Sequence, residues 1–132
     1  MTPARLEGIV YGAGALRAAA HGDRMMWALH RAALTHGVVP VVTVGAVAEA
    51  YRTEPRGDRL DALLAGAEIE PLGRGGAQRI GELAKRAGTA DLLAVSTAET
   101  AARRNAAIVN TRQAALRAAI TALGHDLVQY GV

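Results

Sequence analysis

The chain has 132 residues, which is enough to bury a hydrophobic core but short for two domains, and 51% of the residues are apolar. These values predict one globular domain over residues 1–132 and exclude a largely disordered chain. The sequence contains no cysteine, which excludes disulfides, thiolate zinc sites and thiol nucleophiles. Aromatic residues amount to only 3%, so nucleic-acid binding by base stacking is disfavoured.

The net charge of +3 rests on arginine, because Lys85 is the only lysine. Arginine binds phosphates in a bidentate way, so a nucleic-acid partner stays open. The arginines are scattered among aspartates and glutamates, however, which is more typical of a solvated surface. No segment approaches the roughly 18–20 uninterrupted apolar residues of a membrane helix, and the start with Arg5 and Glu7 does not resemble a signal peptide. We therefore expect a soluble cytoplasmic protein that does not contact a membrane.

Short apolar runs alternate with longer amphipathic segments along the whole chain, which predicts strands alternating with helices. Asp23, Thr43, Asp58 and Thr89 are the expected helix N-caps. In chain order, the predicted elements are a strand over Glu7–Tyr11, helices over Ala13–Ala20 and Arg24–Thr35, a strand over Val38–Val42, helices that start at Val44 and Asp58, a strand over Ala67–Leu72, helices from Gly73 to Gly88 and from Asp91 to about Arg104, a strand over Ala106–Val109, a helix over Gln113–Leu123 and a strand over Asp126–Tyr130.

This alternation predicts an α/β fold, a three-layer α/β/α sandwich with a mostly parallel sheet of about five strands. In the strand over Ala67–Leu72 we expect Ile69 to point inward and the two flanking glutamates, Glu68 and Glu70, to point outward. Right-handed crossovers place the carboxyl ends of parallel strands along one edge of the sheet, where ligands bind in open α/β folds.

Few acids stand near the ends of these strands. The first strand leads to Gly12, and the strand over Ala106–Val109 leads to Asn110-Thr111-Arg112. The helices between them carry Glu49 and Asp91 as the plausible inward carboxylates. This edge of the sheet is therefore predicted to hold few carboxylates.

Four local segments are informative together with the order of the elements. They are Gly8–Leu16, Val41–Glu49, Gly88–Val95 and Asn105–Arg112. The segments and the order of elements resemble the PIN domain family, metal-dependent ribonucleases that include the VapC-type toxins of toxin–antitoxin pairs. In this resemblance the segments correspond, in the same order, to the family's first strand and turn, its second strand and following helix, the helix with the third acid, and the last active-site strand. The chain is also similar to small PIN proteins of high-GC bacteria.

Active PIN domains bind Mg²⁺ or Mn²⁺ with four acids, because hard divalent cations take oxygen ligands. The resemblance places these acids at Gly12, Glu49, Ala94 and Arg112, so three of the four positions are substituted. A second register remains open, in which Asp91, one helical turn before Ala94, is the third acid. Glu49 and Asp91 are then the remnant catalytic and metal-binding residues, and the first position is empty in either register.

Two functions follow from this resemblance. The first is a PIN-fold pseudo-nuclease with a degraded metal site, which acts as a binding or assembly module and has no cofactor. The alternative is a weak Mg²⁺- or Mn²⁺-dependent endoribonuclease that uses Glu49 and Asp91 to activate a water molecule. The family also implies a homodimer, and an antitoxin-like protein or RNA as a further partner.

Two roles are open for Arg112. It could pair with Asp91 or Glu49, so that an internal salt bridge replaces the metal ion. Alternatively, its guanidinium could join the backbone amides around Gly12 to Gly14 and bind an anion such as phosphate.

Other motifs have plainer explanations. Gly12-Ala13-Gly14 lacks the third glycine of a dinucleotide loop and indicates a tight turn from strand to helix. The histidines share no spacing typical of zinc ligands, and we expect them at helix ends or on exposed helix faces. They are His21, His30, His36 and His125.

Overall fold

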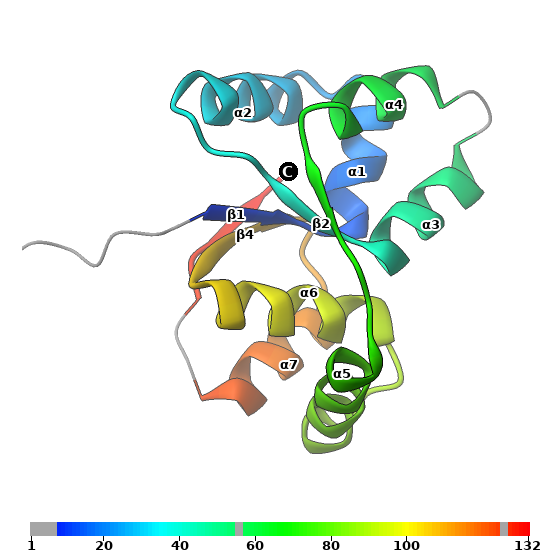
Figure 1. Cartoon of the computed structure of the whole chain (residues 1–132), viewed down its shortest axis with the longest axis vertical. Coiled ribbons are helices and arrows are strands. Elements are labelled where there is room, and N and C mark those ends of the chain that lie inside the picture. The colour runs from blue at the N-terminus through cyan, green and yellow to red at the C-terminus, as the bar shows by residue number, and fades with distance from the viewer. Residues whose placement is uncertain (1–7, 55–56, 125–126) are drawn as a thin grey trace, which may run out of the picture.

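The computed structural model describes residues 8–54, 57–124 and 127–132, and these form a five-stranded sheet in the order β3-β2-β1-β4-β5. Every strand pair in it is parallel. The fold predicted from the sequence, a three-layer α/β/α sandwich, is confirmed (Figure 1). The strands are β1 (Gly8–Tyr11), β2 (Val41–Thr43), β3 (Glu68–Glu70), β4 (Ala106–Asn110) and β5 (Gln129–Gly131).

The helices form one layer on each side of the sheet (Figure 1). One layer consists of α1 (Ala13–Ala20), α2 (Arg24–Thr35), α3 (Val44–Thr53) and α4 (Asp58–Leu64). The other consists of α5 (Arg74–Ala87), α6 (Leu92–Arg104) and α7 (Ala114–Leu123). In the part of the chain that the structure describes, no helix is long and apolar enough to cross a bilayer.

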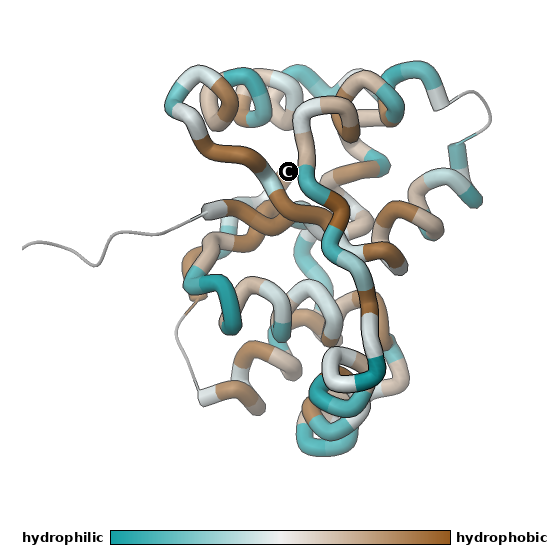
Figure 2. Tube along the Cα trace, in the orientation of Figure 1, coloured by the Kyte–Doolittle hydropathy of each residue, from teal (hydrophilic) through white to brown (hydrophobic). Residues whose placement is uncertain are grey.

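The central strands feed two separate cores because successive residues of a strand point to opposite faces. In β1, Val10 packs against α5–α7, whereas Tyr11 packs against α1–α4. Alanines allow the first helices to approach closely, and α1 contacts α3 through such small side chains. Figure 2 shows hydrophobic residues along β2, while α5 at the outside is mostly hydrophilic.

The strand register brings three chain segments to one edge of the sheet. Tyr11 at the end of β1 pairs with Val42 on one side and Val109 on the other. The Gly12 N–H donates to the Val109 carbonyl at 2.9 Å. The residues that follow β1, β2 and β4 therefore lie together at the carboxyl edge, as the parallel topology requires.

Two helix starts differ from the prediction. Gly57 is the N-cap of α4 instead of Asp58, and its φ of 76° is left-handed, which favours glycine. Asp91, not Thr89, caps α6, since its Oδ1 accepts from the Ala94 N–H at 3.1 Å. The Asp23 and Thr43 caps are confirmed, because each side chain accepts a backbone N–H three residues later.

The prediction for β3 is wrong about its faces. Ile69 is 47% exposed, whereas the Glu70 side chain is only 14% exposed and faces α6. The reason is that β3 is an edge strand whose two faces are covered unequally. The face of Glu70 meets arginines of α6 that neutralise it, so a carboxylate there is stable.

The prediction that the histidines are exposed or at helix ends is wrong for His30. It lies within α2, is 3% exposed, and its Nδ1 is 2.9 Å from the Tyr11 hydroxyl oxygen, within a hydrogen bond. Trp27 meets its ring edge to face, with centroids 5.8 Å apart. His30 is therefore part of the core between α2 and β1. His125, and the predicted strand ends Glu7 and Asp126, lie outside the described residues.

Burial of His30 gives a testable dependence of stability on pH. Burial lowers the pKa of His30 below its ordinary value of 6.5, so the unfolded chain binds the proton more readily than the folded chain. We expect the free energy of unfolding to fall as the pH drops through 6.5 toward the lower folded pKa. Urea unfolding at about pH 7.5 and about pH 5.5 measures this. His30→Gln should reduce the difference, and exposed His36→Gln should not; equal behaviour of the two variants would contradict the assignment.

Candidate functional site

Glu49 and Asp91, the two carboxylates predicted to meet, line one small pocket of about 170 Å³ at the carboxyl edge of the sheet. Glu49 comes from α3 and Asp91 from the start of α6. Ala94 and Asn110 line the same pocket. The structure therefore brings together residues 42 positions apart that were predicted to form the remnant site (91 − 49 = 42).

Glu49 is already neutralised by arginine. The Arg52 Nε donates to Glu49 Oε2 at 2.9 Å, and Arg52 Nη2 donates to the other carboxylate oxygen. The hydrogen bond from Arg52 lowers the pKa of Glu49 below its ordinary range; burial opposes this, and the nearby charges of Arg52 and Arg17 reinforce it. Glu49 is thus ionised, and its negative charge is paired with the guanidinium of Arg52.

Asp91 has a structural role that the sequence did not reveal. One of its carboxylate oxygens caps α6 by accepting from the Ala94 N–H, and its own N–H donates to Thr89 Oγ1 at 3.1 Å. Ala94 is buried, with 3% of its surface exposed. Both residues proposed for the third acid therefore line the pocket, one as the cap and one in the first turn of the helix.

The side chain of Asn110 fills the space beside Gly12, where the resemblance implies the first acid. A Cβ added to Gly12 would lie 2.3 Å from Asn110 Cγ, well inside van der Waals contact. Asn110 is buried, and its Oδ1 accepts from the Ala15 N–H of α1 at 3.2 Å. The amide thus ties β4 to the first turn of α1, and it occupies the place that an acid at position 12 would need.

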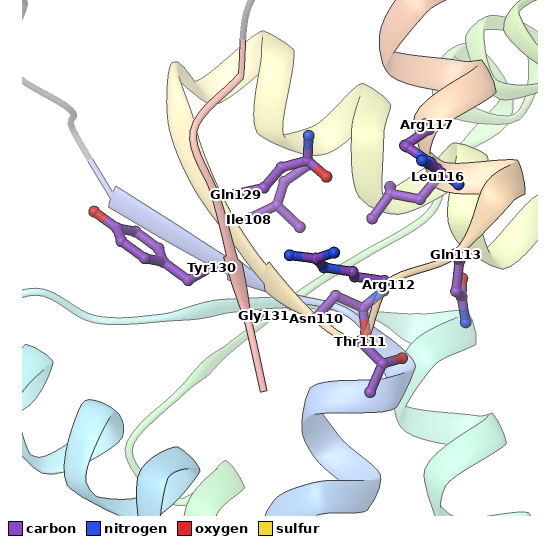
Figure 3. Close-up of a pocket in the computed structure, with 10 residues that line it drawn as sticks. All are labelled: Ile108, Asn110, Thr111, Arg112, Gln113, Leu116, Arg117, Gln129, Tyr130 and Gly131. Carbon is purple, nitrogen blue, oxygen red and sulfur yellow. The ribbon is translucent and has the colours of Figure 1, made fainter.

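Arg112 does not pair with either acid, so the predicted salt bridge is wrong. Its side chain is exposed and lines a separate pocket of about 370 Å³ beside α7 (Figure 3). Among the described residues it forms no ion pair. Nearby amides are bonded within the protein, since the Gly12 N–H donates to the Val109 carbonyl and the Ala15 N–H to Asn110 Oδ1.

Arg17 was not predicted as a site residue. It lines the pocket of Glu49 and Asp91 and adds a positive charge near Glu49. Arg17 follows Ala13 by four residues, which puts both on one face of α1. That spacing was the available signal, since Ala13 comes directly after the first acid position.

The residues present do not suit a divalent cation. Mg²⁺ and Mn²⁺ favour octahedral sets of oxygen ligands. Among residues 8–54, 57–124 and 127–132, no three His, Asp or Glu side chains lie close enough to hold a metal ion. Glu49 accepts hydrogen bonds from Arg52, and one oxygen of Asp91 accepts from the Ala94 N–H of α6. These carboxylate oxygens are therefore already bonded to groups of the protein.

A second polar cluster lies between β3, α5 and α6. Its three acids and three arginines balance in charge, and the central acid is Glu70. Glu70 accepts from Arg103 at 2.6 Å, from Arg104 at 2.9 Å and from Thr100 at 2.9 Å. The other members are Glu68, Glu99 and Arg79. The charges of this cluster are paired with one another. Its ion pairs attach the edge strand β3 to α6, so the cluster is explained by its structural role.

Comparison with known proteins does not assign a family. A scan against models of known protein families finds no match, and neither does a search of curated proteins. A fold of this class hosts many unrelated functions, so the function has to be argued from the site.

Proposed function

We propose that this chain is a PIN-like domain with a degraded metal site, a pseudo-nuclease related to the toxin–antitoxin ribonucleases that binds or assembles without cleaving. The observation that carries the proposal is the side chain of Asn110, which fills the space above Gly12. The order of strands and helices and the meeting of Glu49 with Asp91 in one pocket support the relationship.

The loss of cleavage follows from charge and ligand count. Hydrolysis by a metal-bound water requires a cation that lowers the water's pKa, and such a cation needs several oxygen ligands held around it. Here the available carboxylates are Glu49 and Asp91, and the positive charges of Arg17 and Arg52 stand beside Glu49. Cation binding would have to displace Arg52 and overcome repulsion from Arg17.

The alternative is a weak Mg²⁺- or Mn²⁺-dependent endoribonuclease. One observation favours it, namely that Glu49 and Asp91 do share a pocket. In that case both carboxylates would bind the ion, and water would be the nucleophile. Substitution of either acid by its amide would then abolish metal binding and cleavage together.

Titration with Mn²⁺ separates these two functions. We expect no saturable heat up to millimolar Mn²⁺ in calorimetry and no Mn²⁺-dependent cleavage of single-stranded RNA. Saturable micromolar binding that Glu49→Gln removes would overturn the pseudo-nuclease proposal. The matched control is Glu82→Gln, which removes an exposed carboxylate of α5 outside this pocket. A binding signal that both variants reduce equally would reflect general surface charge, and the pseudo-nuclease proposal would stand.

The proposal also carries the partners expected from the resemblance. These are a second copy of the chain in a homodimer, with an antitoxin-like protein or RNA as a further partner, in the cytoplasm. Sedimentation equilibrium of the purified chain tests the dimer, and a monomer over the whole accessible concentration range would contradict it.

A further inference from the structure

A pocket lined by the described residues lies beside the remnant acidic site, between the ends of β4 and β5 and the helix α7. It has a volume of about 370 Å³. Asn110 and Gln113 line both this pocket and the pocket of Glu49 and Asp91, so the two adjoin. Of the polar residues that line it, Arg112 and Arg117 are the charged ones.

The charge of this pocket differs from that of its neighbours. The pockets around Glu49 and around Glu70 contain both signs, whereas the described residues that line this one include two arginines and no carboxylate. Neither guanidinium forms an ion pair with another described residue, unlike Arg52, which is held by Glu49. Two uncompensated positive charges in one concave site attract an anion.

The hydrogen-bonding groups suit a tetrahedral oxyanion. Figure 3 shows the Arg112 guanidinium directed toward the side of the pocket formed by Ile108 and Gln129, while Arg117 comes from α7. Each guanidinium offers a planar fork of donors that matches phosphate oxygens. The side-chain amide of Gln129 adds a neutral donor to the lining.

The size of the pocket indicates a phosphate carried on a larger group. Its volume falls at the lower end of the range for small-molecule sites, roughly 300–1,000 Å³. A nucleotide unit fits this range. Because the pocket adjoins the remnant acidic site, a strand bound there would lead toward the position where an active nuclease would cut.

We propose that Arg112 and Arg117 form a binding site for a phosphate group of an RNA strand or a nucleotide. This inference rests on the proposed binding role of the chain and names the ligand class. In this site the guanidinium groups would contact the phosphate oxygens directly, with no metal ion between the protein and the phosphate.

Fluorescence anisotropy with a labelled single-stranded RNA, recorded in EDTA, tests the site. We expect the double variant R112Q/R117Q to bind about tenfold or more weakly than the unaltered chain, because glutamine cannot replace the charge-assisted hydrogen bonds of the two guanidiniums. The salt dependence should also become shallower, by about 0.7 in the slope of log K against log salt for each phosphate that the variant no longer neutralises. The matched control is R24Q/R31Q, which removes the same charge from exposed positions on α2, in the opposite helix layer.

The outcomes separate the ligand sources and the two proposals. Competition by AMP as well as by unlabelled RNA supports a nucleotide-sized site, and competition by RNA alone supports a strand; inorganic phosphate should compete weakly in both cases.

Equal weakening by the two double variants, or no RNA or AMP binding at all, overturns the phosphate site and leaves the pseudo-nuclease proposal intact. Mn²⁺-dependent cleavage of the RNA after EDTA is removed overturns the pseudo-nuclease proposal instead. Unchanged unfolding midpoints of both double variants verify that the fold is preserved.

Discussion

Gly12→Asp is expected to lower the free energy of unfolding by at least about 1–3 kcal/mol, the typical cost of overpacking a closed site. The new Cβ would lie 2.3 Å from Asn110 Cγ, and the strands on both sides prevent β1 from moving away. The carboxylate would also be buried, which adds a desolvation penalty. Urea unfolding monitored by circular dichroism measures the decrease.

A double-mutant cycle with Asn110→Ala identifies the cause. Alanine at 110 removes the three atoms nearest to an added Cβ at position 12, so Gly12→Asp should cost less in that background, with a coupling of about 1 kcal/mol or more. Gly8→Asp is the matched control, because a Cβ at Gly8 meets no atom within 4 Å, and its cost should stay below about 1 kcal/mol. Additive effects in the cycle would show that Asn110 does not block position 12.

Glu70→Gln is expected to destabilise the fold by about 1–3 kcal/mol, the range for a charge-assisted hydrogen-bond group that is largely buried. The carboxylate accepts from Arg103, Arg104 and Thr100, and the neutral amide cannot balance the two guanidiniums. Burial alone would raise the pKa of Glu70, but these hydrogen bonds outweigh it and lower the pKa below 4.5. Unfolding in urea at neutral pH measures the effect.

The pH dependence of Glu70→Gln checks the same contact independently. Since the folded pKa is lowered, the contribution of Glu70 is present above pH 4.5 and disappears as the pH falls through the folded pKa. The variant should therefore lose less stability than the unaltered chain over that acid range. Glu68→Gln is the control, because the Glu68 side chain is 54% exposed and, among the described residues, forms an ion pair only with Arg104, at 3.1 Å. Its cost should stay below about 1 kcal/mol, and an equal cost for both variants would contradict the central role of Glu70.

The sequence predicted the order of all the described strands and helices because local signals agree with the global fold. Asp23 and Thr43 are polar residues directly before amphipathic segments, and each caps a helix as expected. The face of β3 was predicted wrongly, since alternation alone does not tell which side of an edge strand is covered. His30 was missed for a similar reason, because the polar partner that satisfies it, Tyr11, is 19 residues away.

The sequence placed Glu49 and Asp91 near the ends of the strands, and the structure has both lining one pocket. Their side-chain contacts were not predicted. Which arginine pairs with Glu49 depends on side-chain geometry. Glu49 forms its ion pair with Arg52, three residues later on the same helix, and not with the distant Arg112. The packing of Asn110 against Gly12 could not be read from the chain either, because it joins residues 98 positions apart across a strand pair (110 − 12 = 98).

The close packing of Asn110 against Gly12 makes it difficult to introduce an acid at position 12 by single mutations. An acid introduced at position 12 collides with Asn110, whereas shortening Asn110 first removes the acceptor of the buried Ala15 N–H. Either first step therefore lowers stability. In an evolving lineage, residues 12 and 110 can change only together without this cost, so the pair stabilises the present form of this edge of the sheet.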